Sequence, residues 1–330
     1  MTTIKTNLTK ELLVKLEKHL QDFSYGDSPK ELYEPITYIM SLGGKRIRPL
    51  LTLLAYSLYK KDYENALTPA MAVEVFHNFT LMHDDIMDEA PLRRGQTTVH
   101  EKWDTNTAIL SGDVMLVKAY EILAEVPADK LGDCLSLFNK TAREVCEGQQ
   151  RDMNFESLDE VTEAEYLEMI RQKTAVLLGF ALQFGAILAG ASKKDSQYLY
   201  DFGVNIGIGF QLKDDLLDVY ADQDKFGKQV GGDIIANKKT FLLIKAKELA
   251  NGEDKKQLED WLSKTNFDKE EKVKEVRALY DKLGIKDIAE NKMTAYFDLG
   301  FAQLNDLNIS NKEMLTALKV LTQNLIDREQ

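Results

Sequence analysis

The placement of proline is the feature of this chain that most restricts its fold. All six prolines fall at or before Pro127, so everything after that residue lacks the strongest helix breaker. Apolar residues in 162–191, 197–220 and 238–249 recur with the i, i+3, i+4 spacing of helices rather than alternating. No segment gives a convincing β-hairpin or βαβ signal, and no linker-like composition interrupts the chain. The sequence therefore predicts a single all-α domain over residues 1–330, large enough for a substantial core.

The charge balance excludes some kinds of partner. The chain has 42 Lys and Arg against 54 Asp and Glu, a net charge of −12, and it lacks a basic stripe that could follow a phosphate backbone. We therefore expect no nucleic-acid binding. The N-terminus has no apolar run typical of a signal peptide, and no stretch approaches the roughly 18 uncharged apolar residues of a membrane-spanning helix. Two cysteines are too few for a disulfide framework. Together these observations lead us to expect a cytoplasmic protein without a transmembrane segment.

A D-D-x-x-D motif occurs twice in the chain, at 84–88 and at 214–218. Positions i and i+4 share a helix face, so the first and last carboxylates of each motif point the same way and repel each other. Mg²⁺ is held by such oxygen ligands and leaves positions for water and substrate phosphates. A solvated acidic surface is the simpler explanation, but apolar segments at 79–82 and 207–212 place both motifs at the edge of a core. We interpret the motifs as two Mg²⁺-carboxylate sites that grip a diphosphate.

Positive charge is concentrated close to the acidic motifs. The segment 43–49 (Gly-Gly-Lys-Arg-Ile-Arg-Pro) is a glycine-led basic cluster, in which Lys45 and Arg48 would face one side if the segment were helical. Arg93 and Arg94 follow the first acidic motif in what should be a loop, and guanidinium groups suit bidentate phosphate contact. Other cations of this kind are Lys173, Lys228 and Lys238. Each alone could be a solvated surface charge, but together they favour diphosphate binding.

In combination these motifs resemble those of the trans-prenyl diphosphate synthases, which have the isoprenoid synthase fold. The resemblance implies an all-α fold with helices packed around a deep apolar cavity, and a homodimer. It implies Mg²⁺-dependent head-to-tail (1′-4) condensation of isopentenyl diphosphate with an allylic diphosphate (dimethylallyl, geranyl or farnesyl). The matching motifs run in the family's order: Gly-Lys-Arg-Ile-Arg-Pro at 44–49, His83–Asp88, Arg93–Gly95, Gly148-Gln149-x-x-Asp152, Lys173-Thr174, Phe210–Asp218, Gly227-Lys228, Gly232-Asp233 and Lys238-x-Thr240.

The resemblance also implies a role for each site residue. Three Mg²⁺ ions would be ligated, with support from neighbouring carboxylates, by the set Asp84, Asp85, Asp88, Asp214, Asp215 and Asp218. The allylic diphosphate would be bound by Arg93, Lys173, Lys228 and Lys238, and the carbocation would be stabilised by dipoles of Thr174 and Gln211. Isopentenyl diphosphate would be held by Lys45, Arg48, His77 and Arg94. The released diphosphate would take the final proton, so no side-chain base is required.

Product length depends in this family on residues just before the first acidic motif. Phe79 lies five residues before Asp84, the small Thr80 four and Phe76 eight, a pattern that resembles the synthases making C20 geranylgeranyl diphosphate. Farnesyl diphosphate (C15) remains an alternative, and a longer product is less favoured. On a helical wheel Thr80 and Phe76 lie closer than Phe79 to the Asp84 face, so the role of Phe79 rests on the family pattern.

Other interpretations can be weighed against the same residues. Glu74 and His77 have the E-x-x-H spacing of di-iron bundles, but no second E-x-x-H accompanies them, so we reject a di-iron site. A class I terpene cyclase would normally replace the second D-D-x-x-D with a different metal motif and would lack the 44–49 sequence. An inactive partner subunit of a heteromeric synthase would lose acidic motifs, and both are intact here.

Overall fold

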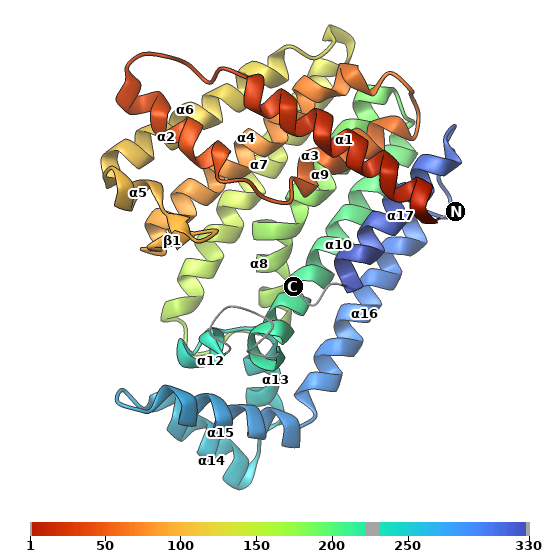
Figure 1. Cartoon of the computed structure of the whole chain (residues 1–330). Helices are drawn as coiled ribbons and strands as arrows, with labels where there is room; N and C mark the ends of the chain where they lie inside the picture. Colours follow the sequence, from red (N-terminus) through yellow and green to blue (C-terminus); the bar gives the residue numbers. More distant parts are fainter. Residues whose placement is uncertain (1, 222–230, 328–330) are drawn as a thin grey trace. The chain divides into compact units, whose positions relative to one another are not determined.

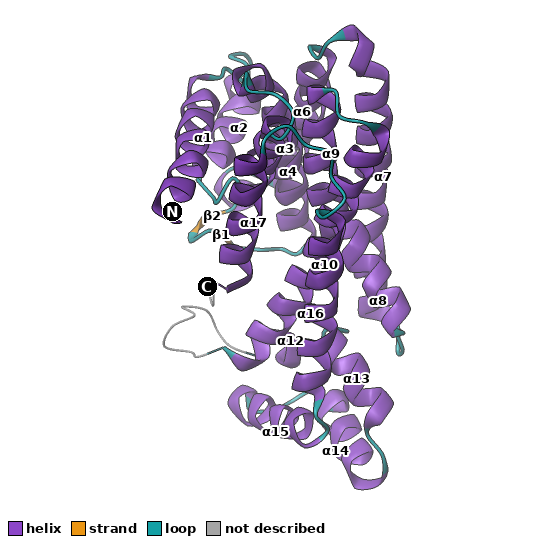
Figure 2. Cartoon of the chain, turned by 90° about the vertical axis from the view of Figure 1, so that its right-hand side faces the viewer, coloured by secondary structure: helices purple, strands orange, loops and turns teal. Residues whose placement is uncertain are grey.

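The computed structural model describes residues 2–221 and 231–327, and most of these are helical (Figures 1 and 2). The described part of the chain contains one pair of two-residue strands, so the all-α fold class is confirmed. The chain divides into two compact units. Unit 1 comprises Met1–Phe138, Phe180–Leu199 and Leu307–Thr322, and unit 2 comprises Asn139–Gly179, Tyr200–Asp306 and Gln323–Gln330.

Unit 1 is organised around helix α4, Leu67–Met87, which packs mainly against α6 and also against α1, α2 and α3. A helix buried on most sides needs an apolar sequence all round, and α4 has one from Pro69 to Phe79 apart from a few polar residues. Pro69 lies in the first turn, where its missing N–H is not needed. The other elements lying wholly in this unit are α1 Thr2–Asp22, α2 Lys30–Ser41, α3 Ile47–Ser57, η1 Tyr63–Ala66, β1 Leu92–Arg93, β2 Gln96–Thr97, α5 Val99–Lys102 and α6 Thr105–Ala124.

Unit 2 has its own apolar core, in which residues such as Leu212, Leu216, Phe241 and Trp261 are buried together. Helix α13 packs against α8 and α16, and α15 packs against α12, α14 and α16. The elements lying wholly in this unit are α8 Glu163–Ile170, η2 Arg171–Ala175, α12 Gly232–Ile235, α13 Phe241–Leu249, α14 Gly252–Ser263, α15 Lys269–Lys282 and α16 Ile285–Gln303. Four helices contribute residues to both units: α7 Ala128–Ser157, α9 Val176–Ala189, α10 Lys193–Tyr220 and α17 Lys312–Asp327.

A small antiparallel hairpin, β1–β2, corrects the expectation of a plain loop after the first acidic motif. Arg93 pairs with Gln96 and Leu92 with Thr97. The two linking residues, Arg94 and Gly95, have φ of 53° and 75°, which is the backbone of a two-residue hairpin turn. Sequence gives little signal for it, because two-residue strands are too short to show alternation.

The predicted helix over 162–191 is divided in the structure. Between α8 and α9 lies a single π-helical turn, η2, which inserts an extra residue into the helical repeat. The stretch Glu163–Ala189 is long and apolar enough to cross a membrane by length and composition, so the expectation that no segment approaches this length and apolarity is wrong. In its most apolar window 78% of the residues are buried inside the protein, as in a core helix, and this makes it weak evidence for a span.

Candidate active site

The first acidic motif lies at the C-terminal end of α4, and its three carboxylates have different surroundings. Asp84 is half-buried in the last turn, and Asp88 is the exposed C-cap, whose N–H donates to the Asp84 carbonyl at 2.9 Å. Asp85 points away from this face and its side chain is only 3% exposed. The helix therefore leaves Asp84 and Asp88 on the accessible side and turns Asp85 into the protein.

Arg93 of the hairpin is the partner of Asp85. Its Nε donates to both carboxylate oxygens at 2.8 Å and its Nη2 lies 2.6 Å from Oδ1. Burial raises the pKa of Asp85, and the hydrogen bonds and charge of the Arg93 guanidinium oppose that rise. Nη2 also lies 3.9 Å from Asp84. Arg93 thus reaches the edge of the predicted metal site while being held by Asp85.

The basic segment 43–49 does not begin as a helix, which corrects the expectation that Lys45 and Arg48 share a helix face. Helix α3 starts at Ile47, and Lys45 is exposed in the preceding loop. Arg94 donates to the carbonyl of Gly43, and a Cβ at Gly44 would meet the Arg94 guanidinium at 2.9 Å. The backbone at Gly44 has φ of 133°, a conformation that favours glycine.

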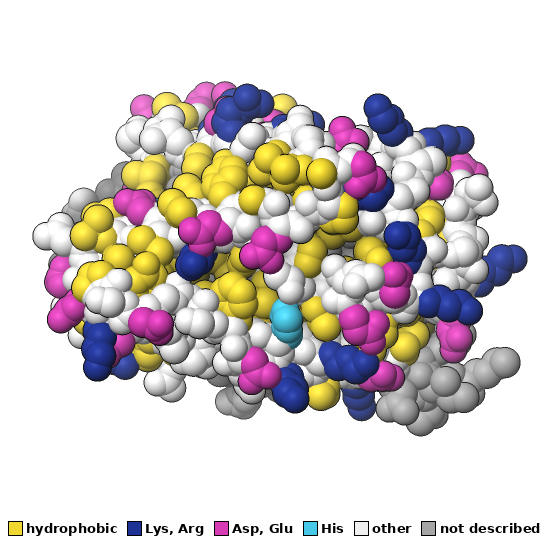
Figure 3. All heavy atoms as spheres, turned by 90° about the horizontal axis from the view of Figure 1, so that it is seen from above, with side chains coloured by type: hydrophobic (Ala, Val, Ile, Leu, Met, Phe, Trp, Pro, Cys, Tyr) yellow, Lys and Arg dark blue, Asp and Glu magenta, His cyan; other side chains and the backbone are white. Residues whose placement is uncertain are grey.

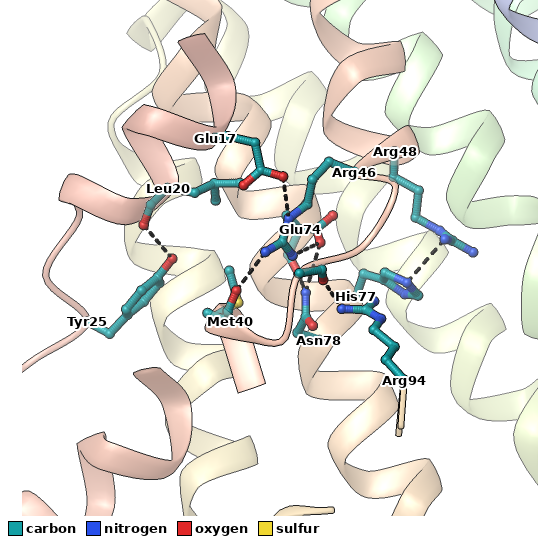
Figure 4. A network of polar contacts seen from close by, with 11 residues as sticks. Glu17, Leu20, Tyr25, Met40, Arg46, Arg48, Glu74, His77, Asn78 and Arg94 are labelled. Atoms are coloured by element: carbon teal, nitrogen blue, oxygen red, sulfur yellow. Dashed lines mark hydrogen bonds and ion pairs between the residues drawn. The ribbon is translucent and has the colours of Figure 1, made fainter. Parts of the chain in front are cut away.

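Arg48, His77 and Arg94 lie together beside Glu74 (Figure 4). Arg48 Nη1 lies 3.1 Å from His77 Nε2, and since a guanidinium only donates, the imidazole accepts and is neutral. Burial, followed by the charges of Arg48 and Arg94, lowers the pKa of His77 well below its usual value. Burial also lowers the pKa of Arg48 to about 10, and Arg48 Nε is buried without a hydrogen-bond partner among the described residues. Arg48 and Arg94 bring two positive charges together in this pocket, and the neighbouring carboxylate of Glu74 is paired with Arg46, so the pocket is suited to an anion.

The second acidic motif lies on α10, and its central residue Asp215 is again buried. It accepts hydrogen bonds from the Tyr166 hydroxyl at 2.5 Å and from the Phe241 N–H at 3.3 Å. Burial raises the pKa of Asp215 to about 7, and the hydrogen bond from Tyr166 opposes the rise. Tyr166 carries no sequence signal that would have identified it as a site residue.

A group of carboxylates surrounds the second motif within unit 2. Asp218 accepts from the backbone N–H of Asp233 at 2.9 Å, which joins α10 to the start of α12. Burial raises the pKa of Asp233 to about 6; Lys238, 4.0 Å away, opposes the rise, and Asp218, Asp152 and Asp214 add to it. Carboxylates that hold one another's pKa up in this way attract a cation. Asp152 and Asp233 belong to the sequence motifs shared with the prenyl diphosphate synthases, but the sequence alone predicts no role for either.

These oxygen donors fit Mg²⁺. No group of three or more His, Cys, Asp or Glu side chains converges closely enough to hold a metal by itself within residues 2–221 and 231–327. Mg²⁺ is a hard cation that takes carboxylate oxygens, often only one or two from the protein, with water and phosphate oxygens at its other positions.

The π turn carries two predicted residues of unit 2, Lys173 and Thr174. Lys173 Nζ lies 2.6 Å from Asp152 of α7, and the Thr174 hydroxyl lies 3.4 Å from Gln211 Oε1 of α10. A Cβ at Gly148 would collide with the Lys173 backbone nitrogen, so only glycine allows α7 to approach the turn. Lys228 lies outside the described residues.

The predicted chain-length residues lie in unit 1 on α4, in an aromatic cluster. The Phe76 ring is fully buried, with ring centroids 5.6 Å from Phe79 and 5.0 Å from Phe138. Phe79 also contacts the His83 ring at 4.8 Å, and Thr80 is half-buried with its hydroxyl on the His77 carbonyl. The structure thus brings Phe76 and Phe79 into contact one to two turns before Asp84.

Charges elsewhere on the surface are mixed. On the face drawn in Figure 3, Lys and Arg side chains alternate with Asp and Glu around hydrophobic clusters, and the described residues form no continuous basic stripe there. This face offers no surface of the kind that binds nucleic acid.

Comparison with known proteins gives a consistent result. Residues 29–283 match the family model described as polyprenyl synthetase. The chain is 39% identical over 298 residues to the geranylgeranyl pyrophosphate synthase of Geoglobus acetivorans, with 90% of each chain covered. It is 40% identical over 303 residues to the geranylgeranyl diphosphate synthase of Methanosarcina mazei, with 91% of each covered. The crystal structure of geranylgeranyl pyrophosphate synthetase from Pyrococcus horikoshii superposes with a TM-score of 0.91 at 34% identity, covering 99% of each chain.

Proposed function

Because the chain belongs to the polyprenyl synthetase family, we propose that it is a trans-prenyl diphosphate synthase that makes C20 geranylgeranyl diphosphate. It condenses isopentenyl diphosphate with an allylic diphosphate in a head-to-tail, Mg²⁺-dependent reaction. The observation that carries the proposal is the pocket of Arg48, His77 and Arg94, where the buried Arg48 Nε has no partner among the described residues. Such a pocket needs an anion, and a diphosphate supplies several acceptor oxygens.

Isopentenyl diphosphate binds in this pocket in our proposal. Lys45, Arg48 and Arg94 donate to its phosphate oxygens. The neutral ring of His77 accepts from Arg48 through Nε2 and can donate through its other ring nitrogen. These residues fix the diphosphate end, so the double bond is presented to the reacting carbon by positioning rather than by chemical activation.

The allylic diphosphate is assigned to the acidic motifs. The carboxylates of Asp84, Asp88, Asp214 and Asp218, supported by Asp85 and Asp215, hold three Mg²⁺ ions in this proposal. Bound Mg²⁺ supplies Lewis-acid stabilisation of the departing diphosphate. Arg93, Lys173, Lys228 and Lys238 add charge-assisted hydrogen bonds to the same leaving group. Asp152 beside Lys173 and Asp233 beside Lys238 keep these ammonium groups in place before the substrate arrives.

The reaction balances without an oxidant or a side-chain base. The allylic C1–O bond breaks and its electron pair leaves with diphosphate. The isopentenyl double bond then forms the new C–C bond to C1, and a proton is lost to the released diphosphate as a new double bond forms. The Thr174 hydroxyl donates to Gln211 Oε1, and the remaining lone pairs of the two oxygens stabilise the transient cation, since neutral dipoles do so without trapping it.

The defining test uses purified protein with Mg²⁺ and labelled isopentenyl diphosphate. C5, C10 and C15 allylic diphosphates are supplied separately, and product chain length is analysed. We expect elongation with each starter and accumulation of the C20 product. Absence of elongation with every starter would remove the proposed function, whereas a C15 end product would revise only the chain length.

We also propose that the enzyme is a homodimer. On α6 the exposed residues Leu110 and Val117 lie two turns apart, 58% and 55% exposed, so they share one helix face. Apolar residues aligned in this way are typical of a surface that another subunit covers. Light scattering of the purified protein should give a dimer mass, and the Leu110→Glu/Val117→Glu variant should shift towards monomer.

A further inference from the structure

The cations of the basic segment 43–49 are not equivalent. Lys45 is exposed and Arg48 is half-buried, but the Arg46 side chain between them is only 3% exposed. Figure 4 shows the Arg46 and Arg48 side chains leaving the start of α3 in opposite directions, with Arg46 directed towards Glu74. Arg46 is therefore turned away from the side where Arg48 and His77 meet.

The guanidinium of Arg46 joins three other helices to the start of α3. Its Nη1 lies 2.6 Å from Glu74 of α4, its Nη2 donates to the Met40 carbonyl of α2 at 2.6 Å, and its Nε lies 3.3 Å from Glu17 of α1. Each nitrogen of the planar group thus has an acceptor on a different helix. A lysine could not satisfy these three directions, because its ammonium is a single point charge.

The backbone at Arg46 explains why such an attachment is needed. Arg46 has φ of 46°, a left-handed conformation that is costly for a residue with a Cβ, and it follows Gly43 and Gly44, which also have positive φ. A loop in this conformation persists only when its surroundings fix it. The side-chain contacts of Arg46 supply that constraint directly before Arg48.

Glu74 completes the arrangement from α4. Its Oε1 accepts from Arg46 and from Asn78 Nδ2 at 3.1 Å, and Asn78 also donates to the Glu74 carbonyl at 2.9 Å. His77 lies three residues further along the same helix, next to this fixed carboxylate. Glu74 is hydrogen-bonded to Arg46 and not to Arg48, so Arg48 keeps its capacity for an external anion.

We propose that Arg46 is a positioning residue for the isopentenyl diphosphate pocket, acting with Glu74 and without contacting the diphosphate. It fixes the 43–46 loop and the start of α3 against α1, α2 and α4, so that Lys45, Arg48 and His77 are in place before the substrate binds. The inference rests on the proposed function for the identity of the anion. From the sequence motif alone, Arg46 could equally be a phosphate ligand; its contacts with Glu74 and the other helices indicate a positioning role instead.

The test compares steady-state kinetics of the intact enzyme for the two substrates. Arg46→Gln should raise KM for isopentenyl diphosphate about tenfold or more, because several charge-assisted hydrogen bonds that fix the loop are lost. KM for the allylic diphosphate and kcat should stay within about threefold, since only one pocket is loosened. Arg46→Lys should recover only part of the loss. Arg143→Gln, at an exposed arginine of α7, is the matched control and should leave both KM values unchanged.

A double-mutant comparison separates positioning from direct binding. If Arg46 acts through Arg48, KM for isopentenyl diphosphate should differ by less than about threefold between Arg48→Gln and the Arg46→Gln/Arg48→Gln variant. Multiplicative losses would instead make Arg46 an independent phosphate ligand and overturn the inference. A fall in kcat together with a rise in KM for both substrates would also overturn it, because that pattern indicates a general structural role.

Two further measurements keep the inference falsifiable. If Arg46→Gln does not fold, the Arg46→Gln/Glu74→Gln pair removes both buried charges and should still show the raised KM; a wild-type KM would contradict the proposal. Calorimetric titration with isopentenyl diphosphate alone measures binding without turnover. An inactive wild-type protein would defeat the proposed function, and calorimetry would then still test the inference. Weaker binding by Arg46→Gln than by Arg143→Gln, with the Arg46→Gln/Arg48→Gln variant no weaker than Arg48→Gln, would support positioning. Equal binding by Arg46→Gln and Arg143→Gln, or multiplicative losses in the double variant, would contradict it.

Discussion

The two acidic motifs have the same letters, and each has a buried central carboxylate, but the partners of these carboxylates differ. Asp85 is paired with the guanidinium of Arg93, whereas Asp215 is paired with the neutral Tyr166 hydroxyl and a backbone N–H. Burial raises the pKa of both carboxylates; the Arg93 guanidinium opposes the rise at Asp85, and the pKa of Asp215 reaches about 7. Identical motifs therefore give one carboxylate beside a fixed opposite charge and one whose charge depends on pH or on a bound cation.

The largest expected effect concerns what the two motifs share. Asp84→Ala and Asp214→Ala should each lower turnover by at least about a thousandfold, because each removes a carboxylate assigned to Mg²⁺. Turnover is measured with saturating Mg²⁺ and both substrates, with Asp260→Ala at an exposed position of α14 as the control. Near-normal activity of either variant would break the symmetry between the motifs and defeat the assignment of that motif to metal.

The next effect distinguishes the two buried partners. Arg93→Gln should lower the free energy of unfolding by about 2–3 kcal/mol, because the substitution leaves Asp85 without a counter-charge. The effect is smaller than for a fully buried ion pair because Arg93 is partly exposed. Tyr166→Phe should cost only about 1–2 kcal/mol, the loss of one hydrogen bond to a group that keeps the Phe241 N–H. Urea denaturation at neutral pH without Mg²⁺ measures both. A larger cost for Tyr166→Phe would reverse the comparison.

The pH dependence of stability should include a contribution from Asp215. The folded pKa of Asp215, about 7, lies above the value of about 3.9 for an unfolded aspartate, so between them the folded state holds a proton that the unfolded state has lost. Its contribution to stability is full below about pH 4 and is lost as pH rises through about 7. Denaturation of the Mg²⁺-free protein from pH 5 to 8 should show this decline, in the same direction as that from Asp233. Asp215→Asn should reduce the slope, and an unchanged slope would assign the decline to other groups.

The smallest effect on catalysis concerns the residues that precede each motif. Five positions before Asp84 stands Phe79, and five before Asp214 stands Gly209, where a Cβ would collide with the Phe297 ring. Phe79→Ala should lengthen the product with little change in rate, whereas Gly209→Ala should lower stability by about 1–3 kcal/mol through overpacking and leave product length unchanged. Chain-length analysis and thermal unfolding measure the two. A C20 product from Phe79→Ala would refute its role in limiting growth.

Several parts of the site could be predicted from particular residues. Helical spacing alone puts Asp84 with Asp88 and turns Asp85 about 100° away, which agrees with its burial. The same spacing cannot predict that Arg93 reaches back to Asp85, because this depends on a two-residue hairpin turn. Nor can it distinguish Arg46 from Arg48, since both are arginines in one basic segment and only the loop conformation directs them to opposite sides.

The sequence by itself determined the helical fold, the family and the kind of chemistry, because these depend on local spacing, on the absence of proline and on the type of each side chain. It also named the carboxylates and cations of the site. Only the tertiary structure decided which of them are paired with each other. Pairing depends on burial and on contacts between distant segments, such as Tyr166 with Asp215 and Arg46 with Glu17, Met40 and Glu74. Those contacts set which charges are already neutralised and which remain available to a substrate.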